Sequence, residues 1–251
     1  MVATPKTILI TGASSGIGAA TAIAAAECGY DVGIGYHSDR EGAEITAKRV
    51  RALGQTAVIL QADISDPDDV ENMFEHFDEE LGELGVLVNN AGIVDEPARV
   101  ENISHARLRR MFDINTIGPF LCAKQAAIRM SYQFGGAGGV IVNVSSMAAS
   151  LGSAGRYVDY AASKGALDVL TKGLGDEMAA NHVRVVGVRP GIIDTEIHAK
   201  NGEPDRVRNM SNELPMHRAG SAREVADTIV YLMSDKASYI TATSIDVGGG
   251  R

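Results

Sequence analysis

The sequence is poor in aromatic residues and in cysteine. Its 251 residues include no tryptophan, 5% aromatic residues and two cysteines, Cys28 and Cys122. So few cysteines exclude a disulfide-rich secreted fold. Both lie in apolar segments with helical spacing, and we therefore expect buried thiols rather than a disulfide between them.

Long apolar runs are missing as well. No stretch approaches the about 20 apolar residues that a membrane-spanning helix needs. The first residues, MVATPKTILITG, lack the layout of a signal peptide. The sequence therefore predicts a cytoplasmic protein with no membrane partner.

An excess of positive charge is absent too. The net charge is −9 and the isoelectric point is near 5.1, so the overall field repels a phosphate backbone and we expect no nucleic-acid partner. The histidines show no ligand spacing such as H-x-x-x-H, which predicts surface positions and no metal site. They are His37, His76, His105, His182, His198 and His217.

Short apolar runs alternate regularly with longer segments of helical spacing. The runs lack strict alternation of polar and apolar residues, so we expect strands that are buried on both faces. Such an order predicts one doubly wound domain, a seven-stranded parallel sheet with helices on both faces. The expected strands are 7–11, 31–36, 57–61, 86–89, 140–145, 183–188 and 244–247. The least regular segment, 196–218, is expected to form a flap over a substrate site.

The first expected strand runs into a glycine-rich turn, TILITGASSGIG, and then into a helix. Gly12 allows a tight turn, Gly16 lets the backbone approach a pyrophosphate, and Gly18 permits close packing of helix against strand. Free N–H groups at the start of the helix would face the negative charge. No Lys-Ser or Lys-Thr follows, which disfavours a P-loop nucleotide hydrolase.

The same turn also fits G-x-S-x-G, the nucleophile elbow of α/β-hydrolases, so a hydrolase is a rival hypothesis. That elbow needs earlier strands and an upstream loop that supplies the oxyanion hole. Only eleven residues precede Gly12. The position of the motif therefore disfavours a hydrolase.

Two tyrosines, Tyr157 and Tyr160, precede Lys164 in the segment RYVDYAASKGAL. Tyr160 and Lys164 are four residues apart and would share one face of a helix, whereas Tyr157 would lie two turns from the lysine. A nearby cation lowers the pKa of a phenol from about 10, as acid/base catalysis near neutral pH requires. On its own, Y-x-x-x-K is equally compatible with a surface pair.

Further motifs give this pair its context. They are TGASSGIG (11–18), NNAG (89–92), Asn115 in FDINTIG, NVSSMAA (143–149), YAASK (160–164) and RPGIIDT (189–195). In kind and order they resemble the short-chain dehydrogenase/reductase family over nearly the whole chain, with similarity to glucose dehydrogenase-like and 3-oxoacyl-carrier-protein reductase-like members. The resemblance implies a Rossmann-like fold over residues 1–251, a homotetramer, and an oxidoreductase that interconverts a small-molecule ketone or aldehyde and an alcohol.

The resemblance also implies roles for the catalytic residues. Tyr160 would protonate the carbonyl oxygen, Lys164 would lower the pKa of that tyrosine and hold the nicotinamide ribose, and Asn115 would hold a water. A serine would donate a hydrogen bond to the substrate oxygen. The alignment favours Ser146 over Ser145, although its separation from Tyr160 is one residue longer than is common in the family.

The cofactor expected from the resemblance is NADP, with NAD as the alternative. The residue after the second strand that reads the ribose 2′-OH is usually acidic, and here it is Tyr36, followed by His37 and, further on, Asp39 and Arg40. No carboxylate at Tyr36 would repel a 2′-phosphate. The residues expected to bind the cofactor are Gly12, Ser14, Ser15, Gly16, Ile17, Gly18, Tyr36, His37, Asp63, Ile64, Asn90, Ala91, Gly92, Tyr160, Lys164, Pro190, Gly191, Ile193 and Thr195.

One further alternative is a regulator that binds the dinucleotide without catalysis. Loss of the tyrosine or the lysine would mark it, and both are present. Fold and cofactor site do not define the substrate. Sugars, steroids and acyl thioesters all stay open.

Overall fold

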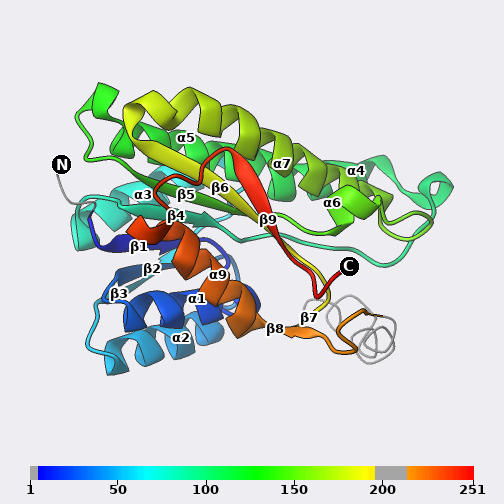
Figure 1. Ribbon diagram of the computed structural model, residues 1–251, viewed down its shortest axis with the longest axis horizontal. Helices are drawn as coiled ribbons and strands as arrows, with labels where there is room; N and C mark the ends of the chain where they lie inside the picture. The colour runs from blue at the N-terminus through cyan, green and yellow to red at the C-terminus, as the bar shows by residue number, and fades with distance from the viewer. Residues whose placement is uncertain (1–4, 196–213) are drawn as a thin grey trace.

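The central feature of the fold is a seven-stranded parallel sheet with the strand order β3-β2-β1-β4-β5-β6-β9 (Figure 1). The computed structural model describes residues 5–195 and 214–251. The strands are β1 (Thr7–Ile10), β2 (Asp31–Tyr36), β3 (Ala57–Gln61), β4 (Val86–Asn89), β5 (Gly139–Val144), β6 (Val183–Pro190) and β9 (Thr243–Val247). The predicted parallel sheet is confirmed, with nearly the expected strand bounds.

Helices cover both faces of this sheet (Figure 1). One layer contains α1 (Gly16–Glu27), α2 (Arg40–Ala52) and α9 (Ala222–Met233), and the other contains α3 (Pro67–Leu81), α4 (His105–Phe112), α5 (Gly118–Met130) and α7 (Val158–Met178). A short helix, α6 (Ala148–Leu151), follows β5, and a second, two-stranded sheet pairs β7 (Ile193–Asp194) with β8 (Gly220–Ser221).

The strands bury both of their faces, which explains why their sequences do not alternate. In β1, Ile8 and Ile10 pack into the core beneath α1, α2 and α9. Leu9, between them, packs into the core beneath α3 and α5. Each side chain is fully buried, so every position of the strand must be apolar.

The topology opens a crevice at the carboxyl end of β1. From β1 the chain proceeds outward to β2 and β3, and it then returns to β4 on the other side of β1. The connections after β1 and β4 therefore diverge. In open α/β sheets, ligands bind at such a switch point.

Side-chain caps begin two of the helices as their sequences indicate. The carboxylate of Asp66 accepts hydrogen bonds from the backbone N–H groups of Asp68 and Asp69, and Pro67 occupies the first turn of α3. Ser221 and Glu224 form a reciprocal capping box at the start of α9. These caps satisfy N–H groups that have no partner within the helix.

The structure corrects one prediction for the cysteines. Cys122 is buried, and burial raises the pKa of its thiol to about 12. Cys28 is exposed, because it follows the last turn of α1 as the C-terminal cap, after the buried alanines of that helix have ended.

The histidines that the structure describes are on the surface, as predicted. His198 and residues 196–213 of the expected flap lie outside the described residues. In the described part of the chain, no helix is long and apolar enough to cross a membrane. Nor does that part contain a cluster of three or more acidic, histidine or cysteine side chains arranged for a metal ion.

Candidate active site

The glycine-rich turn between β1 and α1 forms one wall of the crevice. Gly12 and Gly16 have φ values of 63° and 56°, in the left-handed region that favours glycine. A Cβ atom on Gly12 would lie 2.9 Å from the Cα atom of Ala91, and one on Gly18 would collide with the carbonyl oxygen of Gly12. Gly18 is therefore required because its backbone packs against Gly12 within the same turn. The expectation from the sequence was a contact between helix and strand.

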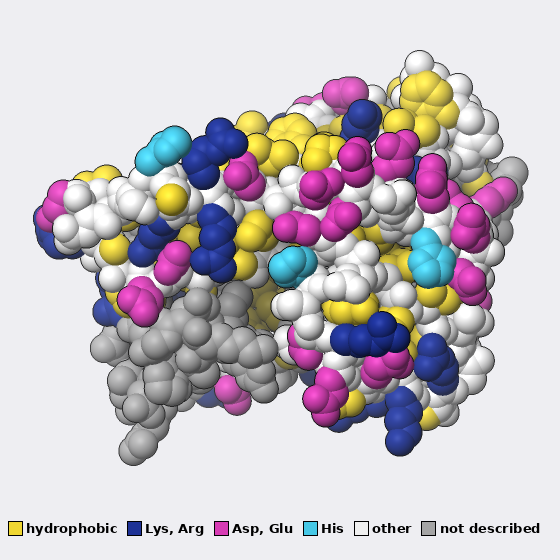
Figure 2. Space-filling model, turned by 180° about the vertical axis from the view of Figure 1, so that it is seen from behind, with side chains coloured by type: hydrophobic (Ala, Val, Ile, Leu, Met, Phe, Trp, Pro, Cys, Tyr) yellow, Lys and Arg dark blue, Asp and Glu magenta, His cyan; other side chains and the backbone are white. Residues whose placement is uncertain are grey.

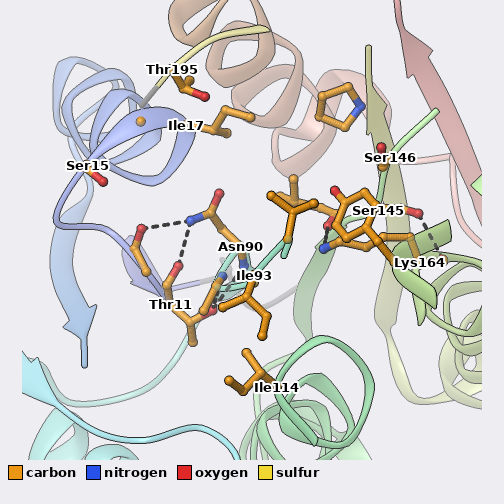
Figure 3. Close-up of a pocket in the computed structure, with 18 of the residues that line it drawn as sticks. Thr11, Ser15, Ile17, Asn90, Ile93, Ile114, Ser145, Ser146, Lys164 and Thr195 are labelled. Atoms are coloured by element: carbon orange, nitrogen blue, oxygen red, sulfur yellow. Dashed lines mark hydrogen bonds between the residues drawn. The ribbon is translucent and has the colours of Figure 1, made fainter. Parts of the chain in front are cut away.

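The end of β4 is hydrogen-bonded to this turn. The side-chain amide of Asn90 donates to the carbonyl oxygens of Thr11 and Gly12, both at 2.9 Å. In return, the hydroxyl of Thr11 accepts from the backbone N–H groups of Asn90 and Ala91 at 3.0 Å (Figure 3). Thr11 was missed as a site residue, although it is the first residue of the TGASSGIG motif.

Asn115 holds the loop that follows β4. It lies in a π-helical turn, Asp113–Ile117, between α4 and α5, and it is fully buried. Its side chain accepts from the N–H of Ile93 and donates to the carbonyl oxygen of Ile93, both at 2.8 Å, and it also donates to Ser163 at 3.1 Å. The amide therefore clamps the loop to the side of α7.

Lys164 is buried one turn from Tyr160 on α7. Its Nζ donates to the carbonyl oxygen of Val144, at the end of β5, at 2.8 Å, and lies 5.9 Å from the ring centroid of Tyr160. Burial lowers the pKa of the ammonium to about 8, and the charge of Asp168 opposes that change. A Cβ atom on Gly92 would lie 3.3 Å from Nζ, so the backbone after β4 packs directly on the lysine.

Two serines follow β5 and differ in their surroundings. Ser145 is buried and its hydroxyl donates to the carbonyl oxygen of Lys164 at 3.1 Å. The hydroxyl of the half-buried Ser146 accepts from the N–H of Ala148 at 3.1 Å. Both serines and Lys164 lie at the end of the crevice opposite to Ser15 and Thr195 (Figure 3).

These elements enclose a cavity of about 450 Å³, which we call the central cleft. Of the predicted site residues, all line the cleft except Gly18 and Asn115, which lie behind its wall. Tyr157 lines it together with Tyr160. Sequence reasoning missed several lining residues, among them Thr11, Asp39, Ile93, Val94, Met147, Leu151 and Arg251.

The end of the cleft near β2 carries two carboxylates and an imidazole. Asp63 accepts hydrogen bonds from the hydroxyl and the N–H of Ser65, and the first of these mainly lowers the pKa of its carboxyl. The imidazole of His37 lies 3.9 Å from the same carboxylate. Asp39 caps α2 by accepting from the N–H of Gly42 at 3.0 Å.

Comparisons with known proteins give the family of the chain. A family model described as enoyl-(acyl carrier protein) reductase matches residues 12–251. The chain is 50% identical to the uncharacterized oxidoreductase YgfF of Escherichia coli, over 97% of this chain and 98% of that protein. It is 35% identical to the 3-oxoacyl-[acyl-carrier-protein] reductase FabG of Staphylococcus aureus, over 98% and 97%.

Solved structures give the same result. The acetoin dehydrogenase YohF of Salmonella typhimurium matches with a TM-score of 0.87 and 35% identity, over 98% of this chain and 96% of that one. A blue fluorescent protein from a metagenomic library, in complex with NADPH, matches with a TM-score of 0.89 and 31% identity, over 97% and 96%. The chain therefore belongs to the short-chain dehydrogenase/reductase family of oxidoreductases.

Substitution of Gly12 tests the glycine turn. Gly12→Ala should lower the free energy of unfolding by about 1 to 3 kcal/mol, because it combines a positive φ with a contact on the backbone of Ala91. Gly173→Ala, within α7, is the control, since its new Cβ meets nothing within 4 Å. That variant should be neutral or more stable by up to about 1 kcal/mol. Urea unfolding measures both, and equal effects would contradict the assignment.

Proposed function

We propose that the protein is an NADP-preferring oxidoreductase that interconverts a ketone or aldehyde and an alcohol, with Tyr160 as its acid/base. The observation that carries this proposal is the buried ammonium of Lys164, 5.9 Å from the ring of Tyr160 in the wall of the central cleft. With a pKa of about 8, this lysine is mainly protonated at neutral pH. A cation so near stabilises the phenolate and lowers the pKa of the phenol.

The proton chemistry then follows from the chain's own groups. In reduction, the phenol of Tyr160 gives its proton to the carbonyl oxygen, and in the reverse direction the phenolate accepts the proton of the alcohol. The positive charge of Lys164 stabilises the tyrosine in its ionised state, so the proton can be released near neutral pH. Asn115 holds the loop that faces these groups, through its two hydrogen bonds to Ile93.

Ser146 is the serine that we propose for the substrate oxygen. Its hydroxyl accepts from the N–H of Ala148 and so keeps its own proton available for donation into the cleft. The hydroxyl of Ser145 already donates to the carbonyl oxygen of Lys164 inside the protein. We assign Ser145 to fixing α7 against β5.

The glycine turn fits the pyrophosphate of a dinucleotide. Gly12 and Gly16 leave the cleft wall without side chains, and Ser15 begins α1 without a side-chain cap, so N–H groups at its start stay available. Asp63 and Asn90 would hold the adenosine half, and Ile193 and Thr195 the carboxamide end. When bound, the nicotinamide supplies or accepts the hydride.

Replacement of Tyr160 tests the proposed acid/base. Tyr160→Phe removes only the hydroxyl, and it should abolish turnover while NADPH binding, followed by cofactor fluorescence, stays within about twofold of the wild type. Tyr157→Phe is the matched control, because Tyr157 also lines the cleft. Normal turnover in Tyr160→Phe with loss in Tyr157→Phe would reverse the assignment. If the wild type binds NADPH but none of the carbonyl compounds tested leads to its oxidation, the protein is instead a regulator.

The preference for NADP rests on the end of β2. Tyr36 stands where a carboxylate would reject a 2′-phosphate. The nearby carboxylate of Asp39 is held by the first turn of α2. We propose that the exposed His37 lies beside the phosphate.

Kinetics with both cofactors test this preference. The ratio of kcat/KM for NADPH over NADH should be about tenfold or more, corresponding to at least about 1.4 kcal/mol. Tyr36→Asp introduces the missing carboxylate and should invert the ratio, whereas Tyr36→Asn should not. A wild type that prefers NADH would refute the proposal.

The relatives suggest which carbonyl compounds to test first. One is named a 3-oxoacyl-carrier-protein reductase, one a cis-4-hydroxycyclohexanecarboxylate dehydrogenase and one an acetoin dehydrogenase. We therefore propose a panel of acetoacetyl-coenzyme A, 4-oxocyclohexanecarboxylate and diacetyl, each with NADPH. The loss of absorbance at the nicotinamide band reports turnover.

We propose a homotetramer that works in the cytoplasm. Ile117, Phe120, Ile128 and Val169, on or beside α5 and α7, are 43% to 72% exposed, and hydrophobic side chains line the corresponding upper edge in Figure 2. An apolar surface of this kind is typical of an interface between subunits. Light scattering should give four times the 26.4 kDa chain mass, and Val169→Glu should lower that mass. A monomeric wild type would contradict the proposal.

A further inference from the structure

Arg107 on α4 and Asp159 on α7 form a nearly buried ion pair beside the central cleft. The guanidinium donates from Nε and Nη2 to the two carboxylate oxygens, at 2.7 and 3.2 Å. The side chains of Arg107 and Asp159 are 13% and 0% exposed. A fork of two parallel bonds fixes the relative orientation of its partners as well as their distance.

The same guanidinium also holds the loop between β4 and α4. Its remaining nitrogen, Nη1, donates to the carbonyl oxygen of Glu96 at 2.7 Å. Two residues further along this loop, the N–H of Ala98 donates to the carbonyl oxygen of Arg156 at 2.8 Å. Three segments therefore meet at Arg107: the loop after β4, helix α4 and the start of α7.

The start of α7 is held by local and long-range contacts. Tyr157 is the N-terminal cap residue; its side chain forms no capping hydrogen bond, and its N–H donates to the carbonyl oxygen of Ser153 at 3.1 Å. Gly152 and Gly155, just before it, have positive φ values and open space where a Cβ would stand. Asp159 lies in the first turn, where the helix dipole favours a negative charge. Its bond to Arg107 is a long-range contact between side chains that fixes this turn.

Both sides of the junction carry residues of the central cleft. Tyr160 follows Asp159 directly, and Ile93 and Val94, on the loop that Arg107 holds, also line the cleft. A buried ion pair contributes little net stability compared with an apolar packing of the same size. Its geometric value is greater, because reacting groups must be held within a fraction of an ångström.

We propose that Arg107 and Asp159 are positioning residues, which hold the first turn of α7 against the loop after β4 and thereby set the place of the Tyr160 phenol in the cleft. This inference rests on the proposed function. Neither residue lines the cleft, so both act through the backbone of Tyr160 and of Ile93 to Val94.

The charges of the pair make the inference testable by pH. Beyond Asp159 itself, two nearby groups, Asp95 on the loop and Tyr157 at the start of α7, raise the pKa of the Arg107 guanidinium. Arg110 on α4 lies 4.0 Å from the carboxylate of Asp95. The ring of Tyr160 lies 5.9 Å from Nζ of Lys164; burial lowers the pKa of that lysine, and the charge of Asp168 raises it. In the wild type, the ion pair carries no net charge.

Removing one partner leaves the other charge uncompensated. Asp159→Asn leaves a guanidinium near Tyr160, which favours the phenolate and lowers its pKa, so the rise of alcohol oxidation with pH should move to lower pH. Arg107→Gln leaves a carboxylate next in sequence to Tyr160, which raises that pKa and moves the rise to higher pH. A merely structural role would not move the profile in opposite directions.

The matched control is the ion pair between Arg129 on α5 and Asp78 on α3. It has the same Nε to Oδ2 distance of 2.7 Å and joins two helices of the layer that contains α4 and α7. Unlike Asp159, neither of its residues is next in sequence to a residue that lines the cleft. Its variants are Arg129→Gln and Asp78→Asn. They should lower thermal stability without changing kcat or the pH profile.

The experiment measures kcat, KM, NADPH affinity by fluorescence, melting temperature and pH profile for these four variants and for Arg107→Lys. Kinetics use the fastest carbonyl–alcohol pair of the panel with diacetyl, acetoacetyl-coenzyme A and 4-oxocyclohexanecarboxylate. We expect kcat to fall about 10- to 100-fold in Asp159→Asn and Arg107→Gln. Their affinity for NADPH should stay within about twofold of the wild-type affinity. Arg107→Lys keeps the charge but cannot form the fork, so it should fold, lose kcat and keep the wild-type pH profile.

The inference is overturned if the Arg107 and Asp159 variants lose stability as the controls do but keep kcat, or if both move the pH profile in one direction. Should Asp159→Asn and Arg107→Gln not fold, Arg107→Lys decides alone, and unchanged kcat in it overturns the inference. Failure of the proposed function has a different signature: the wild type then shows no turnover, or shows turnover that Tyr160→Phe leaves unchanged.

Discussion

An ammonium group can be buried only where hydrogen bonds replace the water that it loses, and the carboxyl ends of two neighbouring strands provide that environment for Lys164. The carbonyl oxygen of Val144, at the end of β5, accepts a hydrogen bond from Nζ, and the backbone of Gly92, after β4, packs against Nζ. The residual cost appears as the lowered pKa of the lysine. The position of this one charge therefore depends on the strand order of the whole sheet, because β4 and β5 must be neighbours.

The strands, though not their order in the sheet, could be inferred from local patterns. Runs such as Ile8 to Ile10 are apolar at every position because both faces of a central strand are covered, and this signal is contained in a few adjacent residues. The caps at Asp66 and Ser221 are equally local. The prediction for Cys28 was wrong because a local pattern does not fix where a helix ends. Apolar neighbours and helical spacing extend to Cys28, but the helix ends one residue earlier and leaves the side chain in solvent.

The site could be predicted where a short motif carries it and not where its parts are distant in sequence. The glycine turn and the Tyr160 to Lys164 spacing are visible in a dozen residues. The pairing of Arg107 with Asp159 spans 52 residues, and no periodicity in either helix indicates that the two side chains meet. The choice between Ser145 and Ser146 likewise needs coordinates, because adjacent residues differ only in the direction that each hydroxyl takes.

Helix α7 is fixed along its length by polar contacts to the rest of the protein. They are Asp159 to Arg107, Ser163 to Asn115, Lys164 to Val144, Asp168 to Arg189 and Thr171 to Asn143. A shift of the helix by even part of a turn would break all of them together, because the partners lie on four different elements: α4, the π-helical turn, β5 and β6. Tyr160 lies between the first two contacts, so its place relative to the sheet is among the most constrained in the molecule. Val94, Met147 and Leu151 line the cleft outside α7, so these side chains can differ without moving the helix that carries Tyr160.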